Sequence, residues 1–182
     1  TGDSGMICFP DAASDKLVRQ LAWLGINKDT YARSNKGTYA WKYDVDYVGY
    51  KYNGNAIMAA IALVQLKYLD RDNARRRQIV EMYNKSFANN PKIKIVGAPN
   101  HEECSYHIYE LIVPDREGLL GKFAENDIYA GVHYRDNIEY SMYRYAEGTC
   151  PKARNISEHI ITLPMHMWLT DEEVMQIANI VN

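Results

Sequence analysis

The sequence predicts an α/β protein, and three observations support this fold class. From residue 91 onward, short apolar runs typical of strands alternate with amphipathic stretches typical of helices. A long helical stretch begins at Asn55 and continues to Phe87. The chain has 182 residues, of which 47% are hydrophobic and 24% charged, and this is enough for one medium domain or two small subdomains.

The first predicted elements are a short strand over residues 6–9 and a helix over residues 12–24, which Gly25 ends. Apolar residues recur in this helix at three- to four-residue spacing, at Leu17, Leu21 and Leu24. A long segment without clear periodicity, residues 26–54, follows. Its tyrosines and Trp41 argue against disorder, so we expect a functional loop.

The long helix predicted over residues 55–87 has two halves of different character. Residues 57–69 are apolar on nearly every side and are expected to be buried. Residues 71–85 are amphipathic, and Pro91 closes the helix. At 1.5 Å per residue, a helix of about thirty residues spans about 45 Å, so it can leave one core and enter another.

The remainder of the chain is predicted to form a small α/β subdomain. Strands are expected over residues 93–96, 106–113, 129–134 and 161–163, and helices over residues 116–126, 152–160 and 170–181. Thr170 followed by Glu173 predicts a capping box at the start of the last helix.

Composition excludes some classes of partner. The net charge of −2 offers no bulk attraction to nucleic acid or to an anionic membrane. The longest nearly apolar run, residues 56–64, has about half the length that a membrane-spanning helix needs. The three cysteines are odd in number and far apart, which favours an intracellular, cytoplasmic protein. The chain lacks an initial methionine and enters a strand almost at once, so we expect either nearby strand partners or a missing first half.

The segment over residues 48–55 is the most informative for function, because it ends the long loop and leads directly into the long helix. A helix start exposes unpaired amides and a partial positive charge, which favour a phosphate. The two glycines of the segment allow close backbone approach, Lys51 supplies a charge, and Asn53 or Asn55 supplies amide donors. The alternative is that Asn55 is only an N-cap and that Lys51 is solvated.

Seven short stretches, each weak alone, occur in an order that covers practically the whole chain. They are residues 2–7 (Gly-Asp-Ser-Gly-Met-Ile), 49–53 (Gly-Tyr-Lys-Tyr-Asn), 57–70, 75–77 (Arg-Arg-Arg), 105–109 (Ser-Tyr-His-Ile-Tyr), 131–134 (Gly-Val-His-Tyr) and 163–166 (Leu-Pro-Met-His). In this order they resemble the C-terminal half of the DegT/StrS sugar aminotransferases, which are fold-type I PLP-dependent transferases.

The resemblance implies an architecture and an activity. Residues 1–54 would be the tail of the large PLP-binding domain with an interface loop, residues 55–90 a long bridging helix, and residues 91–182 a small C-terminal α/β domain. The parent enzyme would be a homodimer that transfers an amino group from an amino-acid donor, usually glutamate, to a keto-sugar nucleotide. A PLP- or PMP-dependent sugar dehydratase of the same family and a non-catalytic binding or scaffold domain stay open as alternatives.

The resemblance also implies which residues act. The lysine that holds pyridoxal 5'-phosphate (PLP) would lie just upstream of Thr1, so no catalytic residue is expected here and the chain alone should be inactive. Asn53, with Lys51 as the second candidate, would reach the PLP phosphate of the partner subunit. Family members commonly have Asn where Lys51 stands and Arg where Asn53 stands, and a Gly-Tyr-Lys-Tyr-Asn variant also occurs.

Further candidates lie on the substrate side. Tyr50, His133, Tyr134 and the loop over residues 31–47 would face the sugar nucleotide, although a His-Tyr pair at a strand end also fits simple packing. A metal site at residues 101–104 (His-Glu-Glu-Cys) is not expected, because no second ligand pair stands at zinc spacing. The arginines of residues 75–77 fit a solvated helix face better than a nucleic-acid site.

Overall fold

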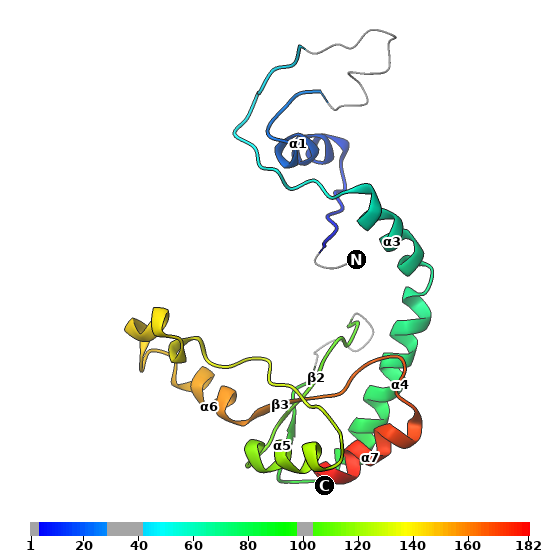
Figure 1. The fold of residues 1–182 in the computed structure, drawn as a ribbon, viewed down its shortest axis with the longest axis vertical. Coiled ribbons are helices and arrows are strands. Elements are labelled where there is room, and N and C mark those ends of the chain that lie inside the picture. The colour runs from blue at the N-terminus through cyan, green and yellow to red at the C-terminus, as the bar shows by residue number, and fades with distance from the viewer. Residues whose placement is uncertain (1–3, 29–41, 98–103) are drawn as a thin grey trace. The chain divides into compact units, whose positions relative to one another are not determined.

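A computed structural model describes residues 4–28, 42–97 and 104–182 of the chain (Figure 1). These divide into two compact units, Thr1–Tyr68 (unit 1) and Leu69–Asn182 (unit 2). Unit 1 contains the helices α1 (Ala12–Ala22) and α3 (Ala56–Leu66). The elements of unit 2 are α4 (Leu69–Phe87), β1 (Lys94–Ile95), β2 (Tyr109–Ile112), α5 (Arg116–Glu125), η1 (Asn137–Glu139), η2 (Ser141–Ala146), α6 (Pro151–His159), β3 (Ile160–Leu163) and α7 (Asp171–Val181).

The first helix of unit 1 forms where it is predicted, and the strand before it does not. Asp11 caps α1 by accepting a hydrogen bond from the Ser14 amide at 2.8 Å. Residues 6–9 form no strand, so that prediction is wrong. Met6 and Ile7 are exposed, since no described strand of unit 1 pairs with this stretch. A strand depends on a hydrogen-bonding neighbour, which an apolar run does not itself provide.

The predicted long helix is two helices. Lys67 and Tyr68 interrupt it, and their amides bond to Val64 and Gln65 three residues back at 3.2 and 3.0 Å. This tighter pattern ends α3 before α4 begins. The burial expected for residues 57–69 is also wrong within this chain, because α3 has no buried residue and Ile57 is 74% exposed. An all-apolar helix is buried only if another element covers it, and the described part of unit 1 supplies none.

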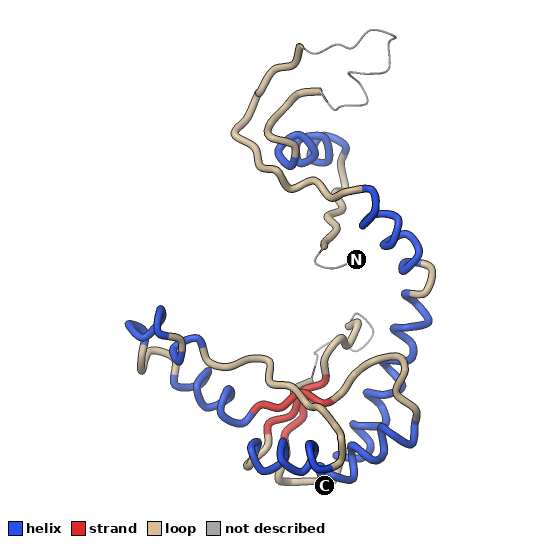
Figure 2. The backbone as a smooth tube through the Cα atoms, in the orientation of Figure 1, coloured by secondary structure: helices blue, strands red, loops and turns tan. Residues whose placement is uncertain are grey.

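Unit 2 is built on a three-stranded antiparallel sheet in the order β1-β2-β3 (Figure 2). The register pairs Lys94 with Ile112 and Tyr109 with Leu163. The strands predicted over residues 93–96, 106–113 and 161–163 are confirmed with somewhat different bounds. Residues 129–134 form only a single bridge between Gly131 and Thr162, so the strand predicted there is wrong. One bridge aligns two backbones without continuing into a ladder.

The helices α5, α6 and α7 confirm the three helices predicted for this part of the chain. The capping box is also confirmed: Thr170 Oγ1 accepts from the Glu173 amide at 3.2 Å, and the Glu173 carboxylate accepts from the Thr170 amide at 2.8 Å. These bonds hold the pKa of Glu173 below its usual value. The short helices η1 and η2 were not predicted, because 3₁₀ helices of three and six residues are too short to show a readable periodicity.

The core of unit 2 lies between the sheet and the helices α4, α5 and α7. Tyr83 of α4 is fully buried; its ring lies 4.9 Å from that of Tyr109, and its hydroxyl donates to the Pro164 carbonyl at 3.0 Å. Burial raises the pKa of both tyrosines. Other side chains without exposed surface are Ile79, Leu111, Phe123, Ile161, Val174 and Ala178. None of the described helices has the length and apolar character needed to cross a membrane.

Candidate functional site

The segment over residues 48–55 is held against the C-terminal end of α1 by backbone hydrogen bonds. The Tyr50 amide donates to the Leu21 carbonyl at 2.7 Å, and the Leu24 amide donates to the Tyr50 carbonyl at 3.0 Å. The Tyr52 amide donates to the Ala22 carbonyl at 2.9 Å. The segment therefore enters α3 from a fixed path along the end of α1.

Two glycines allow this close approach. A Cβ atom on Gly49 would lie 2.1 Å from the Gly25 nitrogen, and one on Gly25 would lie 1.8 Å from the Tyr47 carbonyl oxygen. Gly25 also has φ +73°, a backbone conformation that favours glycine. The two backbones thus cross at a separation that no larger residue permits.

The side chains of the segment alternate between two faces, as extended backbone requires. The rings of Tyr50 and Tyr52 stack at 4.9 Å between centroids with an angle of 11° between their planes. Lys51 takes the other side, and its Nζ lies 3.2 Å from the centroid of the Trp23 ring. The indole Nε1 of Trp23 is buried and has no hydrogen-bond partner within the described chain.

The start of α3 offers donors to an anion. Asn55 Oδ1 accepts from the Met58 amide at 2.9 Å, so Asn55 is an N-cap, as its alternative interpretation held. Asn53 is exposed, and its Nδ2 makes only a long bond of 3.4 Å to the neighbouring Gly54 carbonyl. The first amides of a helix have no partner within it, and the first turn of α3 carries no acidic residue. Asn53 and the amides of this turn that Asn55 leaves uncapped are therefore suited to a phosphate.

His133 and Tyr134 lie in unit 2, beside β3. Gly131 and Thr162 exchange two backbone hydrogen bonds of 2.9 and 2.8 Å, and His133 Nδ1 lies 2.8 Å from the buried Thr162 Oγ1. The imidazole ring of His133 is thus held against β3 by this polar contact. Tyr134 is exposed and makes an edge contact with the His133 ring.

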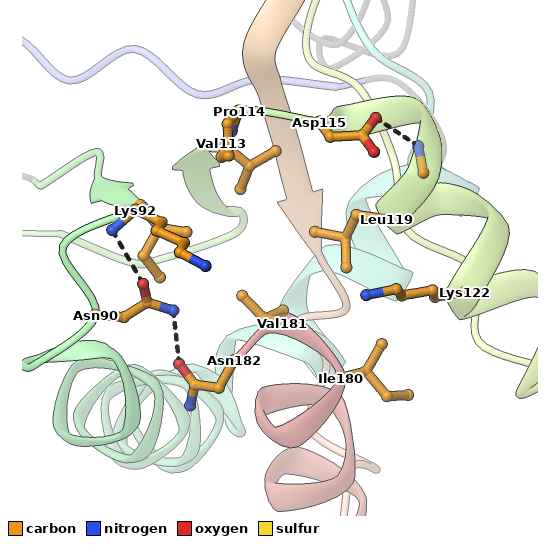
Figure 3. A pocket seen from close by; sticks show the side chains of 12 residues that line it. Asn90, Lys92, Val113, Pro114, Asp115, Leu119, Lys122, Ile180, Val181 and Asn182 are labelled. Carbon is orange, nitrogen blue, oxygen red and sulfur yellow. Dashed lines mark hydrogen bonds between the residues drawn. The ribbon is translucent and has the colours of Figure 1, made fainter.

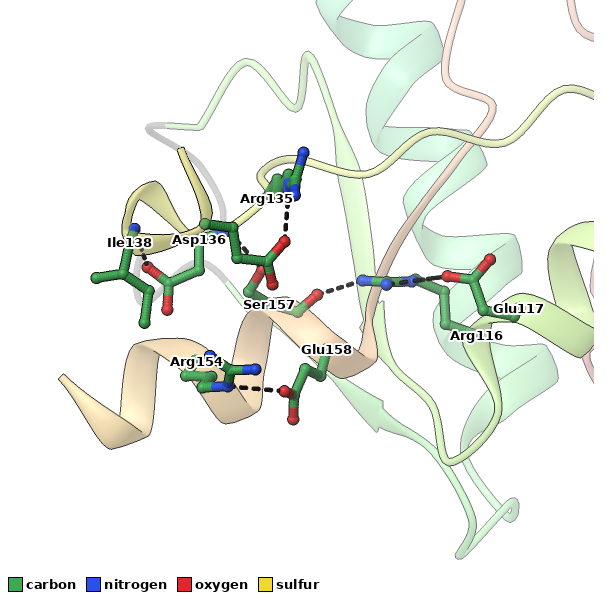
Figure 4. Close-up of polar contacts among 9 residues, drawn as sticks. Arg116, Glu117, Arg135, Asp136, Ile138, Arg154, Ser157 and Glu158 are labelled. Carbon is green, nitrogen blue, oxygen red and sulfur yellow. Dashed lines mark hydrogen bonds and ion pairs between the residues drawn. The ribbon is translucent and has the colours of Figure 1, made fainter. Parts of the chain in front are cut away.

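Next to this pair, a hollow of about 650 Å³ opens between η1, η2 and α6. Polar contacts shape its rim: the Asp136 amide donates to Ser157 Oγ at 2.7 Å, and Arg116 donates to the Ser157 carbonyl (Figure 4). Arg135 pairs with Glu139 and lowers the pKa of that carboxyl group. His133 and Tyr134 thus lie on the wall of an open, mostly apolar hollow with a polar rim.

A second hollow, of about 200 Å³, lies where the end of α7 meets the start of α5 (Figure 3). Asn90 Nδ2 donates to Asn182 Oδ1 at 3.0 Å, and Asn182 Nδ2 donates to the Ser86 carbonyl at 3.2 Å. These bonds tie the C-terminal residue to α4. Because the hollow contains none of the predicted site residues, it is not part of the candidate site.

The predicted site residues are divided between the two units. Tyr50, Lys51 and Asn53 share one segment of unit 1, and His133 and Tyr134 are neighbours in unit 2. Residues 31–41 of the predicted sugar-nucleotide loop and residues 101–103 lie outside the described residues. Among the residues that are described, no group of three His, Cys, Asp or Glu side chains is placed to hold a metal ion.

Lysine exposure bears on catalysis. Every lysine in the three described ranges is exposed to solvent. A lysine that reacts with an aldehyde at neutral pH needs a desolvated pocket or a neighbouring cation to activate its amine. The described lysines do not lie in a desolvated pocket.

The sequence did not predict a role for Trp23, the residue that contacts Lys51. A single aromatic residue at the end of a helix does not indicate which residue it contacts.

The model of the DegT/DnrJ/EryC1/StrS aminotransferase family matches residues 1–182, the whole chain. The chain belongs to this family. A curated relative, the uncharacterized protein MJ1066 of Methanocaldococcus jannaschii, is 28% identical over 192 residues. The match covers 100% of the chain and 49% of the relative, so the chain spans about half the length of this curated relative.

Solved structures similar to this chain confirm the fold class. Spr1654 of Streptococcus pneumoniae, assigned as a sugar aminotransferase, matches in its PMP form with 32% identity and a TM-score of 0.75, over 90% of this chain and 42% of that one. Its PLP form matches with 30% identity and a TM-score of 0.72, over 88% and 40%. The aminotransferase TlmJ of Streptoalloteichus hindustanus matches with 25% identity and a TM-score of 0.75, over 96% and 45%. The chain therefore has the α/β architecture of fold-type I PLP-dependent transferases.

Proposed function

We propose that this chain is the C-terminal part of a PLP-dependent enzyme that transfers an amino group from an amino acid, glutamate by preference, to a keto-sugar nucleotide. The observation that carries the proposal is the family match over residues 1–182, together with a neighbour of 30–32% identity solved in both PLP and PMP forms. An aminotransferase alternates between these two forms of the cofactor. The chain would act as part of a cytoplasmic homodimer.

The residues of unit 1 fit one part of the cofactor, its phosphate. Asn53 and the first amides of α3 supply neutral donors, Lys51 supplies a positive charge nearby, and the first turn of α3 brings no opposing carboxylate. When bound, PLP supplies the electron sink for the transfer. Asn53 would bind and orient the phosphate group, and through it the cofactor of the partner subunit.

The lysine that binds the cofactor would lie in the sequence before Thr1. The exposure of every described lysine supports this, and so does the contact of Lys51 with Trp23, because neither arrangement provides a desolvated amine. The chain alone is therefore expected to lack activity.

The exposed apolar surface of α3 supports the proposal that more protein covers this helix in the parent enzyme. Ile57 and Leu63 are 74% and 66% exposed, and Val64 and Leu66 are also largely open to solvent. Large contiguous apolar patches are rare on soluble monomers and mark contact surfaces. The N-terminal half of the enzyme and its second subunit are the proposed cover.

Within unit 1, Tyr50 is the proposed substrate contact, and within unit 2 His133 and Tyr134 are the proposed substrate contacts. The exposed rings of Tyr50 and Tyr134 offer flat apolar faces and hydroxyls, which suit a sugar or a nucleobase. The hollow beside His133 supports this proposal, since it combines apolar walls with a polar rim.

The full-length enzyme provides the test of the function. We expect its PMP form to convert to PLP, followed by absorbance, when a keto-sugar nucleotide is added, with the amino sugar as product. The dehydratase alternative predicts loss of water from the substrate without an aminated product. The present chain mixed with PLP is expected to form no borohydride-reducible adduct, and such an adduct at one specific lysine between Thr1 and Asn182 would contradict the proposal.

Asn53→Ala is expected to weaken PLP binding by the full-length enzyme about tenfold to a hundredfold, the scale of one hydrogen bond to a charged group. The measurement is the dissociation constant of PLP from the apoenzyme. Asn89→Ala is the matched control, since Asn89 is an exposed asparagine in a turn of unit 2. Unchanged affinity in Asn53→Ala would remove Asn53 from the phosphate site.

A further inference from the structure

Trp23 is located at the C-terminal end of α1, against the segment that is proposed to bind phosphate. An isolated antiparallel bridge pairs its backbone with that of Lys51. The side chains of the same two residues also meet, with Lys51 Nζ 3.2 Å from the centroid of the indole ring. A cation within about 6 Å of an aromatic face is attracted by the ring, and Trp is the strongest such partner. Backbone and side chain thus link this pair twice.

The Lys51–Trp23 contact adds a side-chain tie to a segment whose backbone is hydrogen-bonded to the end of α1. With Lys51 turned toward Trp23, alternation places Tyr50 and Tyr52 on the opposite face, where their rings stack. The Tyr52 amide bonds to the Ala22 carbonyl at 2.9 Å, and Asn53 follows at once. The side chain of Asn53 has only its long bond to Gly54 to orient it locally. Its position therefore depends on the residues that fix the backbone just before it.

We propose that Trp23 is a positioning residue for the phosphate-binding segment and that it acts through Lys51. Trp23 holds the Lys51 ammonium, the held Lys51 anchors the segment, and Asn53 and the start of α3 are presented to the phosphate from that anchor. The inference rests on the proposed function, since it takes the PLP phosphate as the ligand of Asn53.

Trp23→Leu in the full-length enzyme tests this role. We expect its affinity for PLP to fall about tenfold, the scale of a well-formed cation–π contact. Its affinity for pyridoxal, which lacks the phosphate, should stay unchanged, whereas general damage to unit 1 would weaken both. Trp23→Phe should retain most of the PLP affinity, because phenylalanine keeps an aromatic face. Equal PLP affinity in Trp23→Leu and the unsubstituted enzyme overturns the inference.

Lys51→Met shows whether Trp23 acts through Lys51, and it carries the test if Trp23→Leu fails to fold. We expect Lys51→Met to lose PLP affinity selectively as well, and Trp23→Leu, which lowers PLP affinity by itself, to have no further effect in the Lys51→Met background. If the losses of PLP binding free energy in the two single variants simply add in the double variant, the residues act independently and the inference is overturned. Lys51→Arg should retain affinity, since a guanidinium also stacks on aromatic faces.

Failure of this inference is distinguishable from failure of the proposed function. If Asn53→Ala weakens PLP binding and the Trp23 and Lys51 variants do not couple, only the positioning role of Trp23 is refuted. If the enzyme binds no PLP, or if no amino group reaches the sugar nucleotide, the proposed function is refuted directly.

Discussion

Gly49→Ala is expected to separate the phosphate-binding segment from α1. The new methyl group would lie 2.1 Å from the Gly25 nitrogen and 2.8 Å from the Leu21 carbonyl oxygen, well inside contact distance. Because both neighbours are backbone atoms, no side-chain rotation relieves the clash, and the segment must move. We expect unit 1 to lose about 3 kcal/mol or more of stability.

Gly49→Ala should also affect cofactor binding, because the displaced segment carries the proposed phosphate-binding residues. The Tyr50 amide bonds to the Leu21 carbonyl, the same oxygen that the new methyl group approaches. Loss of this bond releases the segment that carries Lys51 and Asn53. In the full-length enzyme, Gly49→Ala should therefore weaken PLP binding at least as much as Asn53→Ala does, and limited proteolysis should cleave near residues 42–52.

Gly54→Ala is the matched control, because it makes the same substitution five residues later in the same segment. A Cβ atom on Gly54 would meet nothing within 4 Å, and Gly54 does not have a positive φ. Its free energy of unfolding should resemble that of the unsubstituted enzyme. If Gly49→Ala proved as stable as Gly54→Ala, the close crossing of the two backbones would be refuted.

Tyr83→Ala should strongly lower the stability of unit 2. Its ring is fully buried between Phe87 and Tyr109, with centroids 5.9 and 4.9 Å away. Removing a buried aromatic side chain costs about 3–5 kcal/mol, while a domain has only about 5–15 kcal/mol of stability in total. The measurement is the urea midpoint of unfolding, followed by circular dichroism.

Two further variants show how much of this loss of stability comes from the buried ring of Tyr83 and how much from its hydroxyl group. Tyr83→Phe keeps the ring but leaves the Pro164 carbonyl without its donor, so it should cost about 1 kcal/mol. Tyr129→Ala removes a tyrosine that is 84% exposed and should change the midpoint little. A Tyr83→Ala protein with the midpoint of Tyr129→Ala would show that the core of unit 2 is not centred on Tyr83.

Contacts between residues close in sequence account for the helix starts that were predicted correctly. The capping box at Thr170 and Glu173 depends on residues three apart, and the start of α1 depends on Asp11 and Ser14. Such contacts lie within a few residues, so sequence patterns contain them. The strand predicted over residues 6–9 and the burial predicted for α3 instead depended on a partner element, which no local pattern specifies.

In the candidate site too, local sequence predicted some features, and contacts between residues distant in sequence decided the others. The segment over residues 48–55 was singled out from its glycines, its asparagines and its place before a helix, and the structure describes it as an extended segment against α1. Asn55 proved to be a cap, and Lys51 proved to lie on Trp23. Both outcomes depend on where a side chain points, which neighbouring residues across the fold decide.

By itself, the sequence determined the family, the α/β class and the candidate segment, since ordered motifs and periodicity are properties of the chain alone. Only the tertiary structure decided that α3 and α4 are separate helices, that α3 is uncovered by the described part of its unit, and that Lys51 faces Trp23. The physical reason is that burial and side-chain direction depend on contacts between residues distant in sequence, and Trp23 and Lys51 are brought together by hydrogen bonds to the end of α1.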